Sequence, residues 1–189
     1  MEQPVHTLLA GWESFYVIAG SVAGALIGLQ FVVIALIADS PRRATAPEIA
    51  AFGTPTVLHF CVALLLSALL SVPWPSPSGL QFSLLTCGIV GVLYIGIVIR
   101  RAKRAQGYRP SMEDWVWHAA LPLVAYLTLV GAAGLLSRAS EPALFLFAVV
   151  TLGLVFIGIH NAWDTITYIA TGAERGEEGA RGSKRQKRR

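Results

Sequence analysis

Long apolar segments that carry almost no charge alternate with short polar connections along most of this chain. A run of about 20 such residues crosses the hydrocarbon core of a bilayer as a helix, because each helical residue adds about 1.5 Å of rise. The pattern predicts an all-α polytopic membrane protein, a bundle of five transmembrane helices over residues 15–38, 55–72, 80–99, 115–136 and 143–163. The last helix extends to 171 if it runs past the membrane.

Composition agrees with the apolar pattern. Hydrophobic residues make up 54% of the chain and charged residues 14%, whereas about 25% of the residues in an ordinary soluble domain are charged. Lipid is therefore the expected solvent for most of the chain. We divide it into a transmembrane domain, residues 1–171, and a short C-terminal tail, residues 172–189.

The basic residues lie almost entirely on one side of the predicted helices. Two of the 15 Lys and Arg residues follow the first helix, five follow the third and seven lie in the tail, so that Arg138 alone falls on the other side. Positive charges are retained on the cytoplasmic side during insertion. The N-terminus is therefore predicted outside and the C-terminus inside, in agreement with an odd number of spans.

The tail is rich in glycine and ends in the basic run Lys184 to Arg189. It has too few apolar residues to build a core, and we expect it to be disordered. Basic residues beside an anionic inner leaflet are attracted to its headgroups, which makes the bilayer surface a predicted partner. No aromatic residue is interleaved with these charges, so nucleic-acid binding is not expected.

Prolines predict two local features. Pro73, Pro75 and Pro77 favour a short extended turn between the second and third helices, which would make those helices antiparallel neighbours. Pro122 cannot donate a hydrogen bond to the carbonyl of His118, and a kink is expected there.

Glycine recurs every fourth residue in the first predicted helix, at Gly20, Gly24 and Gly28. At 100° per residue the three positions lie within about 80° of one another. Without side chains, another helix can approach closely and gain dispersion contacts that lipid does not replace. The strip is either an interface, with a second copy or another membrane protein, or a packing face inside the monomer.

Three histidines form the second suggestive pattern. His59, His118 and His160 each lie a few residues inside the cytoplasmic end of a predicted helix, and Asp164 shares a helix face with His160. The three histidines with the Asp164 carboxylate suit a transition-metal site, and two of the histidines could bracket a haem. The same group could relay protons or sense pH. The alternative is that each ring is satisfied on its own at the interface.

Catalytic motifs are missing: the chain has no HExxH, no GxSxG, no phosphate-binding loop and no GxGxxG. Our main hypothesis is a non-enzymatic membrane protein without a cofactor, a structural, regulatory or accessory subunit that associates through its first helix. The alternatives are a small channel or transporter for protons or a metal ion, and a haem- or metal-binding membrane subunit.

Two stretches carry a family resemblance. Residues 11–16, Gly-Trp-Glu-Ser-Phe-Tyr, and the glycine-rich helix that follows resemble the opening of a group of small bacterial integral membrane proteins without an established biochemical role. The segment from His160 to Asp164 is similar to that group as well. The resemblance implies a multi-pass bundle in a bacterial cytoplasmic membrane and says nothing of a substrate.

Overall fold

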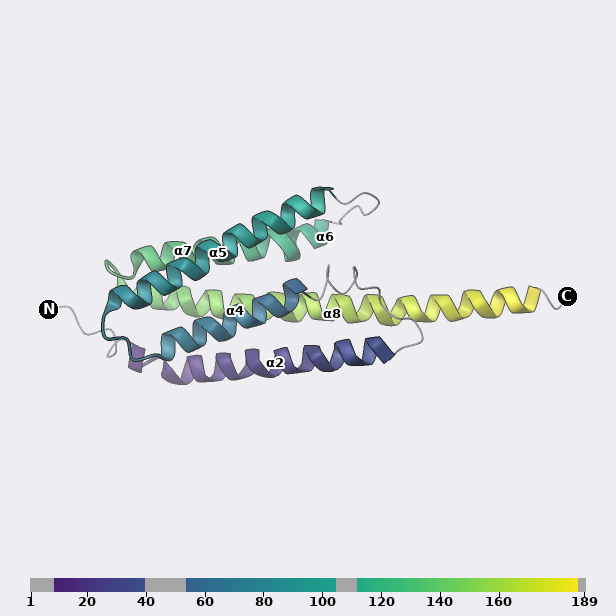
Figure 1. The fold of residues 1–189 in the computed structure, drawn as a ribbon, viewed down its shortest axis with the longest axis horizontal. Helices are drawn as coiled ribbons and strands as arrows, with labels where there is room; N and C mark the ends of the chain where they lie inside the picture. The colour runs from purple at the N-terminus through teal and green to yellow at the C-terminus, as the bar shows by residue number, and fades with distance from the viewer. Residues whose placement is uncertain (1–8, 40–53, 105–111, 187–189) are drawn as a thin grey trace.

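The computed structural model describes the backbone of residues 9–39, 54–104 and 112–186, and the side chains of residues 9–35, 56–101, 103, 112, 113 and 115–167. Within these ranges the chain is helical and has no strand, which confirms the predicted all-α class (Figure 1). The elements are α2 (Glu13–Asp39), α4 (Thr54–Ser71), α5 (Pro77–Arg104), α6 (Met112–Trp115), the π-helical turn η2 (Val116–Ala120), α7 (Leu121–Leu135) and α8 (Ser140–Gln186).

Four helices in the described part of the chain are long and apolar enough to cross a membrane. Their apolar parts cover Glu13–Ala35, Pro77–Arg101, Val116–Leu135 and Ser140–Thr167. The helix predicted over 55–72 is present as α4, but its described apolar part, Thr56–Ser71, is shorter than these four. The whole helix has 18 residues, and the side chains of its first two lie outside the described part of the chain.

Helix α8 lies at the centre of the bundle. It packs against α4 on one side and against α7 on the other, while α2 packs mainly on α4 and α5 mainly on α7 (Figure 1). Inside the protein, 56% of the most apolar window of α8 is buried, against 17% for α2. The bundle is thus two helical hairpins joined through the last helix, with α2 at its edge.

The second and third helices were expected to be close neighbours, but they pack on other helices instead. α4 and α5 run antiparallel, but they share only a small contact, because α4 is occupied by α2 and α8. The turn between them is closed by Trp74, whose Nε1 donates to the carbonyl of Leu69 at 2.7 Å. Helix α5 begins at Pro77, as proline without an N–H favours a first helical position.

Glycines allow the closest helix contacts. The ring of Phe60 on α4 lies directly over Gly158 of α8, and the ring of Tyr126 on α7 lies over Gly91 of α5. Both rings are fully buried. Because lipid tails are as apolar as these rings, close packing of this kind, rather than a hydrophobic drive, holds membrane helices together.

The expected disturbance before Pro122 takes the form of a π-helical turn. In η2 the N–H of Leu121 bonds to the carbonyl of Val116, five residues earlier. The wider turn accommodates the proline ring, which would otherwise crowd the carbonyl four residues before it. Helix α6, η2 and α7 therefore form one continuous rod that carries His118 at its widened turn.

The C-terminal segment differs from the expectation of disorder from residue 172. Helix α8 continues to Gln186, 47 residues from its start at Ser140. No proline follows Pro142 in the sequence, so nothing interrupts the backbone hydrogen-bond ladder. Residues 187–189 lie outside the described part of the chain.

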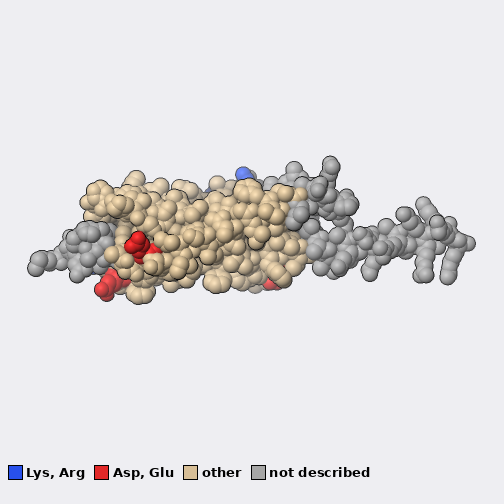
Figure 2. Space-filling model, turned by 90° about the horizontal axis from the view of Figure 1, so that it is seen from below, with Lys and Arg blue, Asp and Glu red and all other residues tan. Residues whose placement is uncertain are grey.

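The ends of the bundle differ in charge. Arg100, Arg101 and Lys103 close α5 at the end from which α8 projects, and Arg138 lies in the connection between α7 and α8 at the opposite end. In Figure 2 the body seen from below is almost wholly uncharged, with acidic side chains mainly at one end and a little basic surface along its upper edge. Arg42, Arg43 and Arg109 lie outside the described residues.

Candidate functional site

The glycine strip of α2 is divided between two environments. A Cβ on Gly20 would lie 3.0 Å from Cβ of Ser67 on α4, so this glycine is used inside the monomer. Gly24 and Gly28 have no atom within 4 Å of the corresponding position. Packing inside the monomer therefore accounts for Gly20, and the other two glycines face open space in the described structure.

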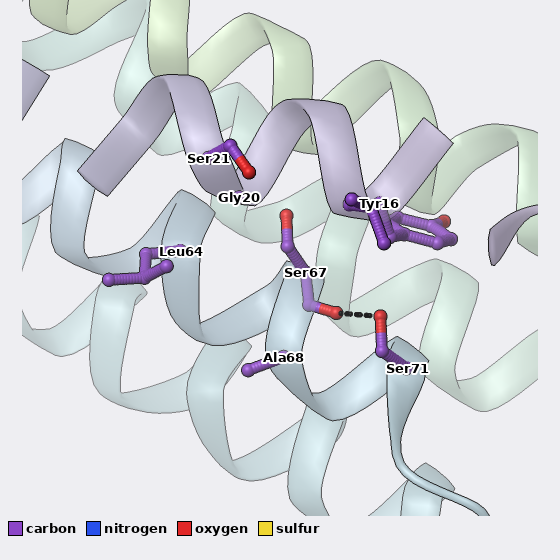
Figure 3. Close-up of a pocket in the computed structure, with 8 residues that line it drawn as sticks. Tyr16, Gly20, Ser21, Leu64, Ser67, Ala68 and Ser71 are labelled. Atoms are coloured by element: carbon purple, nitrogen blue, oxygen red, sulfur yellow. Dashed lines mark hydrogen bonds between the residues drawn. The ribbon is translucent and has the colours of Figure 1, made fainter. Parts of the chain in front are cut away.

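A groove of about 340 Å³ runs between α2 and α4 where Gly20 meets Ser67 (Figure 3). Its walls are mostly small side chains and aliphatic surface. The lining residues are Tyr16, Val17, Gly20, Ser21, Leu64, Ser67, Ala68 and Ser71.

Two of the hydroxyl groups in this groove are used within their own helix, whereas that of Tyr16 is buried and has no partner among the described residues. Ser67 donates to the carbonyl of Ala63 at 2.9 Å, and Ser71 donates to the carbonyl of Ser67 at 2.8 Å. Such bonds to the carbonyl four residues back satisfy a hydroxyl within its own helix. The groove therefore offers a smooth surface of small groups, suited to close packing more than to polar recognition.

His59 is the most enclosed of the predicted histidines. It is fully buried, and its Nδ1 lies 3.1 Å from the hydroxyl of Tyr126 on α7. The hydroxyl donates this bond when the imidazole proton is on Nε2. Nε2 is buried and has no hydrogen-bond partner among the described residues.

His118 and His160 lie in different surroundings. The Nδ1 of His118, on η2, is buried and unpartnered within the described structure. His160 stacks on Trp117 with ring centroids 3.7 Å apart, and its Nε2 lies 3.9 Å from a carboxylate oxygen of Glu113. That carboxylate is largely exposed, so the pair adds little to stability.

The predicted group of four lies in separate surroundings. His59 is buried beside Tyr126, His160 is turned toward Glu113, and Asp164 is exposed. Among the described residues, no group of three or more His, Cys, Asp and Glu side chains is arranged to hold a metal ion. The buried, unpartnered ring nitrogens of His59 and His118 are the chemically distinctive feature of this end of the described bundle.

Two residues of this polar region were not identified from the sequence. Tyr126 supplies the partner of His59, and Asn161 is fully buried with both amide atoms unpartnered within the described structure. Asparagine inside an apolar helix is itself a signal, because a buried amide is costly unless it is paired. Which helix face it occupies could not be read from the sequence.

Comparison with known proteins adds no relative. No family model, no curated protein and no solved structure matches this chain. The resemblance to small bacterial membrane proteins therefore stays a prediction.

Proposed function

We propose that this chain is a non-catalytic integral membrane protein of a bacterial cytoplasmic membrane, a structural, regulatory or accessory subunit that associates through α2. All five long helices cross the bilayer in this proposal, with the N-terminus outside and the C-terminus inside. The end-to-end difference in charge supports that orientation.

The observation that carries the association is the open strip at Gly24 and Gly28 on the edge helix of the bundle. Leu29, Phe31 and Val32, large and exposed, lie close to it in the sequence. Glycines without side chains beside large exposed side chains make a self-complementary surface. The large side chains of one copy can fit over the glycines of the other. We therefore propose a second copy of the chain as the partner, related by a twofold axis.

Leucine at the open glycines tests this interface. Gly24→Leu and Gly28→Leu should weaken self-association in nanodiscs or in detergent at least tenfold in Kd, about 1.4 kcal/mol, because the backbones can no longer approach. Light scattering and single-molecule photobleaching measure the oligomeric state.

Gly131→Leu is the matched control. Gly131 is exposed on α7 and, like Gly24 and Gly28, has no atom within 4 Å of an added Cβ. Helix α7 packs on α5 and α8, whereas α2 packs mainly on α4. It should leave the association unchanged. A wild-type protein that is monomeric, or equal weakening by all three substitutions, would contradict an interface on α2.

Orientation is tested separately with single cysteines. In a background of Cys61→Ala and Cys87→Ala, Ser76→Cys should react with a membrane-impermeant maleimide in intact spheroplasts. Lys103→Cys should react only after the membrane is permeabilised. The reverse labelling pattern would show that the bundle is inserted upside down.

The channel, transporter and metal or haem alternatives have less support. They rest on one shared cluster of His59, His118, His160 and Asp164, and the described side chains do not gather into such a cluster. No observation on these residues favours a second candidate function.

A further inference from the structure

Among the described residues, four buried polar atoms without a hydrogen-bond partner there lie on three elements of the bundle. They are Nε2 of His59 on α4, Nδ1 of His118 on η2, and both amide atoms of Asn161 on α8. A fifth such atom, the hydroxyl of Tyr16, belongs to α2 near the other end of the bundle. Most of the buried polar atoms that lack a partner in the described structure thus lie in one part of the interior.

Contacts between the helices bring these residues to one level. Gly158 of α8 lies under Phe60 of α4, and the two helices run in opposite directions. Asn161 comes one turn after Gly158, so it lies level with the first turns of α4, where His59 precedes Phe60.

The third element joins at the same level. Trp117 of η2 stacks on His160 of α8, and His118 and Asn161 are the residues that follow these two. His59, His118 and Asn161 therefore lie at one level of the bundle, and each has a buried polar atom without a partner among the described residues.

The four atoms together would suit a neutral ligand that both donates and accepts hydrogen bonds. The amide nitrogen of Asn161 needs an acceptor and its oxygen needs a donor. Each free imidazole nitrogen is a donor or an acceptor according to the tautomer of the ring. Polar groups buried in this way are usually bridged by water that makes two to four hydrogen bonds.

We propose that His59, His118 and Asn161 form a buried site for ordered water between α4, η2 and α8. Water accepts from Nδ2 of Asn161, donates to Oδ1, and bridges to the two imidazole nitrogens. Through the bond between His59 and Tyr126, the hydrogen-bonded path reaches α7 as well. This site goes beyond the association proposed for α2 and does not depend on it.

Water-edited solid-state NMR of the wild-type protein in lipid bilayers tests the site directly. Strong transfer from water to the side-chain amide of Asn161 and to the ring nitrogens of His59 and His118 is expected. The side chain of Thr151, also fully buried on α8, should show none, because its hydroxyl donates to the carbonyl of Phe147. A dry Asn161 amide, or a lipid headgroup or another molecule in place of water, would overturn the proposal.

Asn161→Leu provides a second readout. Removal of the amide leaves bridging water without two of its partners, and we expect the thermal midpoint of unfolding to fall by about 3–6 °C. Thr151→Val is the matched control and should shift the midpoint by less. If leucine raises the midpoint instead, the amide was dry and unpaired, and the water site is refuted. Should the leucine variant fail to fold, the NMR measurement on wild type decides alone.

Discussion

Alanine at position 158 should strongly destabilise the bundle, whereas alanine at position 153 of the same helix should be neutral or slightly stabilising. A methyl group on Gly158 would meet the fully buried ring of Phe60, and Gly153 has no atom within 4 Å of the corresponding position. Extra volume in a packed core costs about 1–3 kcal/mol. The effect should lie at the upper end, because α8 is the helix that joins the two hairpins.

Unfolding in mixed micelles, followed by tryptophan fluorescence during titration with a denaturing detergent, measures this difference. Phe60→Leu combined with Gly158→Ala should recover part of the loss, since leucine leaves room for the methyl group. Equal midpoints for Gly158→Ala and Gly153→Ala would show that α4 and α8 are not in the close contact described.

The second large effect is expected at Gly91. A methyl group there would meet the ring of Tyr126, which is fully buried and bonded to His59. Gly91→Ala should therefore cost both packing between α5 and α7 and the hydrogen bond to His59, about 2–4 kcal/mol together. Gly96→Ala on the same helix meets nothing within 4 Å and is the matched control.

Tyr126→Phe separates the two contributions. It removes the hydroxyl but keeps the ring, so it should cost only about 1 kcal/mol. The ring nitrogen shifts of His59, measured by NMR, should change in both Gly91→Ala and Tyr126→Phe and stay constant in Gly96→Ala. If Gly91→Ala left these shifts untouched, Tyr126 would not have to move to admit a methyl group.

The positions of the helices could be predicted from the sequence because lipid imposes a simple requirement, a long apolar run without charge. The first helix was predicted over 15–38 and spans Glu13–Asp39, and the second was predicted over 55–72 and spans Thr54–Ser71. The prediction for α8 was poorest at its C-terminus. Hydrophobicity marks where a helix leaves lipid, whereas the helix itself ends only where its backbone bonds end.

Which helix packs against a given residue could not be predicted in the same way. Gly20, Gly24 and Gly28 have the same spacing and chemistry, yet among the described residues another helix covers Gly20 and not the other two. His59 and His160 likewise share a depth in the bundle but face different neighbours. Periodicity places a residue on a face of its own helix, and the identity of the opposing helix depends on packing across the whole chain.

The central place of α8 has a consequence for how the protein is made. Synthesis runs from the N-terminus, so α2, α4, α5 and α7 are made before the helix that joins them exists. Until then the faces of α4 and α7 that α8 covers in the full bundle have no partner, and the buried ring of Phe60 has no Gly158 beneath it. A nascent chain stopped after residue 139 therefore consists of two unjoined hairpins, each held only by the contacts within it.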